Sequence, residues 1–150
     1  MRLWRREFPD IDCAGKAVVG RLLHLNEKML GEIGHTLAKH RLSYSEFAVL
    51  ATIRVHGAPY RMSPKALLNS LILTSGGLSN ILRRLEQRGA IRRSGDDVDG
   101  RGVLVDLTAL GRRLVEPAMR DHTETERRLI AKLSSAERTL LATALARLMS

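Results

Sequence analysis

One segment, Thr74 to Gly89, constrains the fold of this 150-residue chain more than any other. Thr74 is a suitable N-cap, and Gly89 is a suitable helix terminator. The apolar residues between them recur at the i, i+3, i+4, i+7 spacing of one helix face: Leu78, Ile81, Leu82 and Leu85. The opposite face carries only glycine and hydrogen-bonding residues: Gly76, Ser79, Asn80, Arg83 and Gln87, with Arg84 at its flank. The segment predicts a helix that packs by one side and offers a polar side to a partner.

A second short helix is expected just before this one. Ser63 and Pro64 are suited to an N-cap and a first turn, and three leucines follow them. Upstream, Ser43 and Glu46 have the spacing of a capping box, and the helix that they start extends to Gly57. Two short helices with a tight connection predict a helix-turn-helix, whose second helix fits the major groove of DNA.

Two β-prone runs come after Gly89. Ile91–Arg93 and Val103–Leu107 bracket the turn-rich stretch Ser94–Gly100, so together they predict a hairpin. A helix-turn-helix followed by a hairpin is a winged helix-turn-helix. The expected fold is mainly α with a small β-hairpin wing, in a single domain over residues 1–150.

Longer helices are expected on both sides of this unit. Apolar residues recur with helical spacing from Ala14 to His40, and Thr108 begins another long helix, in which Pro117 predicts a kink. Ser134 and Glu137 have capping-box spacing before a last helix. Residues 1–12 show no period and are interpreted as an arm.

Most of the net charge of +9 comes from one stretch of the chain. Residues 54–93 contain eight basic residues and one acidic residue, Glu86, which gives +7. The basic residues are Arg54, Arg61, Lys65, Arg83, Arg84, Arg88, Arg92 and Arg93. Such a concentration of positive charge predicts a polyanionic partner, because neutralising phosphates releases counterions. A merely solubilising surface is the alternative interpretation.

Several classes of protein find no support in the sequence. No apolar run approaches the about 18 residues that span a membrane, and no secretory signal follows Met1. The single cysteine, Cys13, cannot form an internal disulfide, so we expect a reducing, cytoplasmic location without membrane contact. The five histidines lack metal-site spacing, and no nucleotide-binding or nucleophile motif occurs. We therefore expect no enzyme, no catalytic residue, no metal and no cofactor.

Three motifs around the predicted wing resemble those of one family. Asp99-Gly100-Arg101 is similar to its D-x-R wing motif, Leu85–Arg93 to its L-E-x-x-G-h-h-x-R pattern (h, apolar), and Leu107–Gly111 to its L-T-x-x-G helix start. These motifs are typical of the MarR-type winged-helix transcription regulators. The resemblance implies a homodimeric repressor of a pseudopalindromic double-stranded operator, released by a small-molecule effector. Residues 14–41 and 109–150 would then be dimerisation helices, and residues 43–107 the DNA-binding part.

Three further segments are similar to the branch of this family that contains its urate-responsive and PecS-like members: residues 46–54, 57–61 and 74–77. The chain departs from that branch at two positions. Ala48 stands where the branch commonly has an Asp associated with effector binding, which argues against urate. Gly100 stands where the wing commonly has an Arg, so a weaker phosphate contact is expected there.

The helix pattern and the resemblance together define the candidate DNA contacts. Gly76 and Gly77 remove bulk at the helix N-terminus, which can then approach a phosphate. The resemblance implies that Arg101 enters the minor groove and that Asp99 orients basic side chains. The full set is Ser63, Lys65, Thr74, Ser75, Gly76, Gly77, Ser79, Asn80, Arg83, Arg84, Arg92, Asp99 and Arg101. Arg92 and Arg93 alternate along a strand, so only one of them is expected to face the duplex.

The trigger of such a regulator is less well defined by the sequence. The resemblance gives His24, Phe47 and Arg54 as candidate contacts of an aromatic or anionic effector. Alternatively, Cys13 would make the protein a redox-sensing regulator, as in a branch that senses organic hydroperoxides, although no tyrosine precedes Tyr44. From a different class, the winged helix would be a protein-interaction module whose basic stripe binds an acidic partner without DNA specificity.

Overall fold

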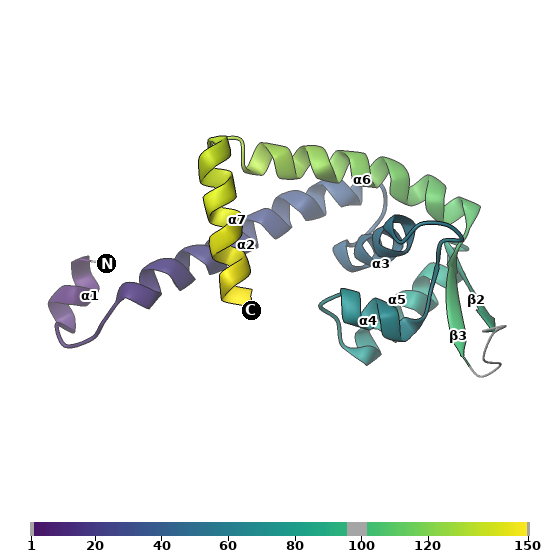
Figure 1. Ribbon diagram of the computed structural model, residues 1–150, viewed down its shortest axis with the longest axis horizontal. Helices are drawn as coiled ribbons and strands as arrows, with labels where there is room; N and C mark the ends of the chain where they lie inside the picture. Colours follow the sequence, from purple (N-terminus) through teal and green to yellow (C-terminus); the bar gives the residue numbers. More distant parts are fainter. Residues whose placement is uncertain (1, 96–101, 150) are drawn as a thin grey trace.

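The computed structural model describes residues 2–95 and 102–149 (Figure 1). Apart from α1 and β1, which the sequence did not predict, its helices and small sheet follow the expected order. The elements are α1 (Arg2–Glu7), α2 (Ala14–Ala38), α3 (Tyr44–Val55), β1 (Arg61–Met62), α4 (Pro64–Ser70), α5 (Ser75–Gln87), β2 (Ile91–Gly95), β3 (Val103–Leu107), α6 (Ala109–Leu129) and α7 (Ser135–Met149). We call residues 42–107 the winged part, since they hold α3 to α5 and the three strands. We call α1, residues 14–32 of α2, and α7 the outer helices.

The helices of the winged part begin at the caps that the sequence predicts. Ser43, Ser63 and Thr74 each accept a hydrogen bond from the backbone N–H three residues on, at 3.2, 3.2 and 3.1 Å. Gly89 ends α5 with a φ of +68°, a left-handed conformation that favours glycine. The predicted boundaries of these short helices are therefore confirmed to within a residue or two.

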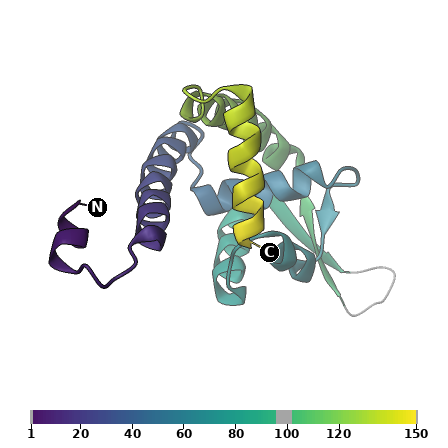
Figure 2. The ribbon, with the colours of Figure 1, turned by 60° about the vertical axis from the view of Figure 1, so that its left-hand side comes forward.

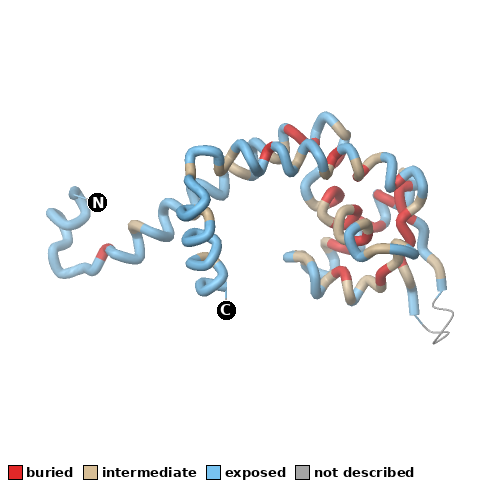
Figure 3. Tube along the Cα trace, turned by 45° about the horizontal axis from the view of Figure 1, so that its top comes forward, coloured by how far each residue is buried: buried red, intermediate tan, exposed pale blue. Residues whose placement is uncertain are grey.

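The core of the protein lies in the winged part and in the adjoining stretches of α2 and α6 (Figure 3). The four apolar residues predicted for one face of α5 are all buried in it. They pack in one cluster with Leu50 and Ile53 of α3, Leu67 of α4 and Val115 of α6. The amphipathic spacing that identified α5 thus corresponds to the observed packing.

The sheet has three antiparallel strands in the order β1-β3-β2. β2 and β3 form the predicted hairpin, with Ile91 opposite Leu107 and Gly95 opposite Val103. The tip of the wing, which carries Asp99 and Arg101, lies outside the described residues. β1 was not expected, because a strand of two residues has too little alternation to be recognised. It pairs Arg61 with Asp106 and Met62 with Val105.

The start of α6 packs closely on the turn between α5 and β2. A Cβ at Gly111 would lie 2.1 Å from the carbonyl oxygen of Ala90, so only glycine fits there. Thr108 caps α6, and its hydroxyl also donates a hydrogen bond to the Gly89 carbonyl oxygen, at 2.7 Å. The L-T-x-x-G motif therefore serves to dock this helix on the winged part. α6 continues through Pro117 without interruption, and the kink at that residue stays a prediction.

α6 joins the winged part to α2. Buried Thr36 and Thr125 share a hydrogen bond of 2.8 Å between their hydroxyls, and His40 contacts Asp121 at 2.8 Å. Beyond this junction α2 extends away from the winged part, and α7 turns sharply from the far end of α6 (Figure 1 and Figure 2). No described helix has the length and apolar character required to cross a bilayer.

The N-terminus corrects one prediction. Arg2 to Glu7 form a short helix, whereas the sequence was interpreted as an arm without periodicity. The Trp4 and Phe8 rings lie 5.5 Å apart, and the Lys16 ammonium sits 3.8 Å from the centre of the Trp4 ring. A helix of under two turns, stabilised by one aromatic pair and one cation–π contact, is too short to show a hydrophobic period.

Candidate nucleic-acid interface

The outward face of α5 is the centre of the candidate interface. The polar residues expected there from the sequence are all exposed: Ser75, Gly76, Ser79, Asn80, Arg83, Arg84 and Gln87. Glu86 is exposed as well, at the edge of this face. Arg83 donates a hydrogen bond to the side-chain oxygen of Asn80, at 3.1 Å, one turn earlier on the same exposed face. A polar helix face that the core supports from behind is what major-groove recognition requires.

The two glycines at the start of α5 have different roles. A Cβ at Gly76 would meet open space, which leaves the backbone accessible to a phosphate. A Cβ at Gly77 would instead lie 3.0 Å from the Thr74 hydroxyl that caps the helix. Gly77 therefore lets the cap close, which is a role that the sequence did not reveal.

The two candidates before α5 also differ. Ser63 is half-buried and uses its hydroxyl to cap α4. Lys65 is exposed two residues later and forms no ion pair with the described part of the chain. Contact of either residue with DNA stays a prediction.

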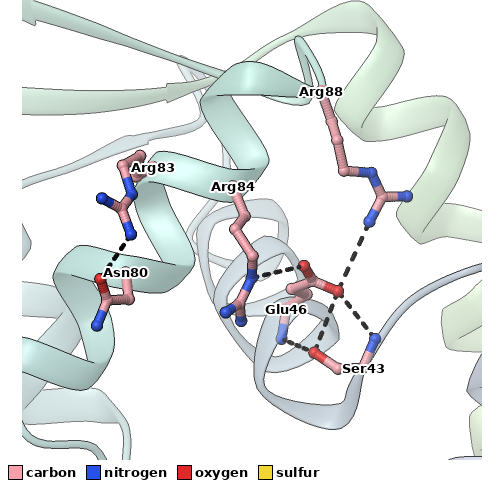
Figure 4. A network of polar contacts seen from close by, with 6 residues as sticks. All are labelled: Ser43, Glu46, Asn80, Arg83, Arg84 and Arg88. Carbon is pink, nitrogen blue, oxygen red and sulfur yellow. Dashed lines mark hydrogen bonds and ion pairs between the residues drawn. The ribbon is translucent and has the colours of Figure 1, made fainter.

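A buried carboxylate, that of Glu46 at the start of α3, holds two arginines of the recognition helix region (Figure 4). Its Oε2 accepts hydrogen bonds from the N–H and the hydroxyl of Ser43, at 3.0 and 3.1 Å. Its Oε1 accepts one from Nε of Arg84, at 3.3 Å, and Nη1 of Arg88 lies 3.6 Å from Oε2. Figure 4 shows Arg84 and Arg88 directed toward Glu46, whereas Arg83 is directed toward Asn80.

The environment of Glu46 keeps it ionised. Burial raises the pKa of this carboxyl, but the hydrogen bonds from Ser43 and the Arg88 and Arg84 guanidinium groups together outweigh burial. The net result is a pKa below the ordinary value of 4.5. Glu46 is therefore a fixed negative charge beside α5 at neutral pH.

A second buried carboxylate, Asp106 on β3, organises the arginines of the sheet. It forms an ion pair with Arg61, its cross-strand neighbour on β1, and lies 3.5 Å from Nη2 of Arg92, its neighbour on β2. Burial raises the pKa of Asp106, and the hydrogen bond from Arg61 with the charges of Arg61 and Arg92 lowers it by more. The Arg92 side chain remains 70% exposed, so it is held and still accessible.

Arg93 lies on the other face of β2 and contacts α5. Its backbone N–H donates a hydrogen bond to the Glu86 carboxylate at 3.2 Å, and its Nε forms an ion pair with the same carboxylate, also at 3.2 Å. It also lines a hollow of about 260 Å³ together with Pro64 and Leu68 of α4 and Ser75 and Ser79 of α5. Arg93 therefore lines the hollow at the start of the recognition helix, whereas Arg92 pairs with Asp106. Contact of Arg92 with the duplex stays a prediction.

The charge stripe of residues 54–93 is partly neutralised by residues outside it. Arg54 forms an ion pair with Glu116 of α6 at 2.8 Å, and Glu46 and Asp106 form ion pairs with the arginines described above. The hydrogen bond from Arg54 lowers the pKa of Glu116. The winged part thus presents fewer uncompensated cations than the count of +7 suggests, and most of its arginines have fixed positions.

The three candidate effector residues lie in different surroundings. Phe47 is buried, with its ring 4.7 Å from that of His122. Arg54 pairs with Glu116, lies over the Tyr60 ring and borders a hollow of about 290 Å³. His24 is exposed on α2 in a separate hollow of about 650 Å³ lined by residues of that helix. The described residues of the single chain do not bring the three into one cavity, so a shared effector site stays a prediction.

The candidate redox residue is not accessible within the chain. Cys13 is only 5% exposed, and its Sγ lies 3.5 Å from the Ile11 carbonyl oxygen. A thiol that senses peroxide must be reached by it. This burial argues against Cys13 as the trigger.

The polar helix packs on the core by its other face, a tight connection joins it to the helix before it, and the wing belongs to a three-stranded sheet. These features define a winged helix-turn-helix DNA-binding protein. Residues 42–103 match the model of the MarR family. The transcriptional regulator PecS of Dickeya dadantii is 36% identical over 144 residues, which cover 96% of this chain and 87% of PecS. The protein belongs to the MarR family of transcriptional regulators.

Two further comparisons agree with this assignment. The multiple antibiotic resistance protein MarR of Salmonella typhimurium is 32% identical over 119 residues, covering 75% of this chain and 81% of that protein. The crystal structure of a cysteine-to-serine MarR variant from Escherichia coli, complexed with operator DNA, is 26% identical. It superposes with a TM-score of 0.79 over 99% of both chains.

Proposed function

We propose that this protein is a homodimeric, cytoplasmic repressor that binds a pseudopalindromic double-stranded operator and leaves it when a small aromatic or anionic effector binds. The observation that carries the proposal is the exposed polar face of α5, which the core supports from behind and which fixed arginines flank. The similar E. coli MarR variant was solved with operator DNA, which supports the same partner here.

The outer helices support the homodimer. Among their described residues none is buried, although they carry large apolar side chains: Leu3, Trp4, Val18, Val19, Leu23, Leu25, Leu30, Leu140, Leu141, Leu148 and Met149. So much exposed apolar surface is unusual for a monomer and typical of an interface. In a two-fold dimer the two α5 helices would lie about 34–36 Å apart, one turn of the duplex.

Selection of duplexes from a random pool, followed by fluorescence anisotropy at several salt concentrations, tests the proposal. We expect enrichment of an inverted repeat, with an affinity that falls steeply as salt rises. A folded dimer that enriches no sequence at low salt would overturn it and favour the protein-interaction module. Compounds that release the selected duplex would then identify the effector class, and release by peroxide that is retained in Cys13→Ser would exclude the redox trigger.

A further inference from the structure

We infer that Glu46 is a positioning residue for DNA binding, whose carboxylate holds Arg84 so that its guanidinium meets the phosphate backbone beside the major groove. The inference rests on the proposed DNA-binding function and concerns a residue that the sequence assigned only to a helix cap. Glu46 lies on α3, outside the recognition helix, and its side chain is only 10% exposed. Any influence on DNA must therefore act through the residues that it holds.

The geometry of the Arg84 contact leaves the rest of the guanidinium available. The hydrogen bond to Glu46 uses Nε, and the side chain of Arg84 remains 53% exposed. Because a guanidinium has five donors in a rigid fork, Nε can serve one anion while the two Nη groups serve another. A held arginine also loses less rotamer freedom when it binds a phosphate than a free one does.

The helix cap alone does not require the charge of Glu46. Glutamine can close a capping box as glutamate does, since only an acceptor for the N-cap N–H is needed. The charge of Glu46 is matched instead by the two arginines, Arg84 at 3.3 Å and Arg88 at 3.6 Å. One side chain thus connects the start of α3 to the recognition helix.

The chain contains a second capping box that lacks this connection. Ser134 and Glu137 at the start of α7 repeat the same three hydrogen bonds, at 2.8, 2.8 and 3.3 Å. Within the described residues Glu137 forms no ion pair. Glu137→Gln is therefore a matched control, with the same chemical change in the same local motif, away from α5.

The sign of the effect distinguishes positioning from simple electrostatics. Glu46→Gln removes a negative charge near the DNA phosphates, so electrostatics alone predicts equal or tighter binding. A positioning role predicts that the affinity for the selected duplex falls about five-fold or more. Glu137→Gln should leave this affinity unchanged.

A double-mutant cycle shows whether the effect passes through Arg84. Dissociation constants for wild type, Glu46→Gln, Arg84→Ala and the double variant are measured by anisotropy on the selected duplex. We expect Glu46→Gln to cause no further loss in the Arg84→Ala background. Unchanged or tighter binding by Glu46→Gln, or an equal loss in both backgrounds, would overturn the inference. If the wild type binds no duplex selectively, the proposed function fails first.

Arg84→Lys gives a second test. It does not depend on whether Glu46→Gln, a substitution at a buried residue, still folds. Arg84 is exposed, so lysine leaves the core intact and keeps the positive charge. Its single ammonium cannot hold Glu46 through one edge and a phosphate through another. We expect a loss similar to that of Glu46→Gln, with an unchanged melting temperature, whereas wild-type affinity would contradict the role of Glu46.

Discussion

The winged part and the outer helices are both rich in apolar residues, but they bury them differently. Leu50, Ile53, Leu67 and Leu85 of the winged part are completely buried within one chain. On α7, Leu140 is 72% exposed, and none of the described residues of that helix is buried. The first region completes its own core, whereas the second leaves apolar surface uncovered within the chain, as is typical of an interface. The contrast predicts that the winged part is stable alone and that the stability of the outer helices depends on assembly.

The largest expected effect is in the winged core. Leu85→Ala should lower the free energy of unfolding by about 2–5 kcal/mol, because it leaves a cavity between α5 and the rest of the core. Urea unfolding followed by circular dichroism measures the change. A loss below about 1 kcal/mol would mean that this region does not form a tight core by itself.

A smaller effect is expected at the outer helices, and it should appear in assembly. Leu140→Glu places a charge on the exposed apolar surface of α7 and should weaken the dimer by about 1.5–3 kcal/mol. Sedimentation equilibrium measures the dissociation constant. Ile72→Glu, at a fully exposed residue between α4 and α5, is the control and should leave the dimer intact. If both variants stay dimeric, the outer helix α7 does not contribute to the interface.

Acid should destabilise the winged part through its two buried carboxylates. The pKa values of Glu46 and Asp106 are lowered in the folded state, from ordinary values of 4.5 and 3.8. Their ionised forms therefore stabilise the fold. This contribution is complete at pH values above the ordinary pKa values, and it is lost as the pH falls through the lower pKa values of the folded state. Melting temperatures between about pH 6 and pH 3 should fall less steeply in Glu46→Gln and Asp106→Asn than in wild type.

The control for the acid effect is Glu137→Gln on α7. The pKa of this exposed carboxyl is also lowered, by its hydrogen bonds from Ser134, but solvent screens its charge. Its pH profile should follow that of wild type. Equal flattening in all three variants would show that the acid response is not specific to the winged part.

The smallest expected effects concern the two capping boxes, which begin at Ser43 and Ser134. Ser134→Ala should destabilise α7 by about 0.5–1 kcal/mol, because one backbone N–H loses its acceptor. Ser43→Ala should cost more, because the Glu46 carboxylate that the Ser43 hydroxyl helps to hold is buried and pairs with Arg84, whereas the Glu137 side chain is exposed. Thermal unfolding of both variants measures the order. A larger loss at Ser134 would contradict the idea that the winged part is the more tightly coupled region.

Local rules were sufficient to predict most helices and the wing. Thr74, Ser63 and Ser43 cap helices because side-chain oxygens satisfy free backbone N–H groups within three residues, which is a purely local requirement. α1 and β1 were missed, because the contact of Trp4 with Lys16 and the pairing of Arg61 with Asp106 join residues that a periodicity search does not connect. The same limit hid the roles of Gly77 and Gly111, which depend on what lies next to their Cα atoms.

The sequence by itself determined the amphipathic α5, its polar outer face and the excess of +7 in residues 54–93, since composition and helical spacing are properties of the chain. Only the tertiary structure decided which of these charges remain available. Glu46, Asp106 and Glu116 come from outside the stripe and fold against Arg84, Arg92 and Arg54. The physical reason is that ion pairing acts over a few ångströms in space, and folding sets those distances without regard to separation along the chain.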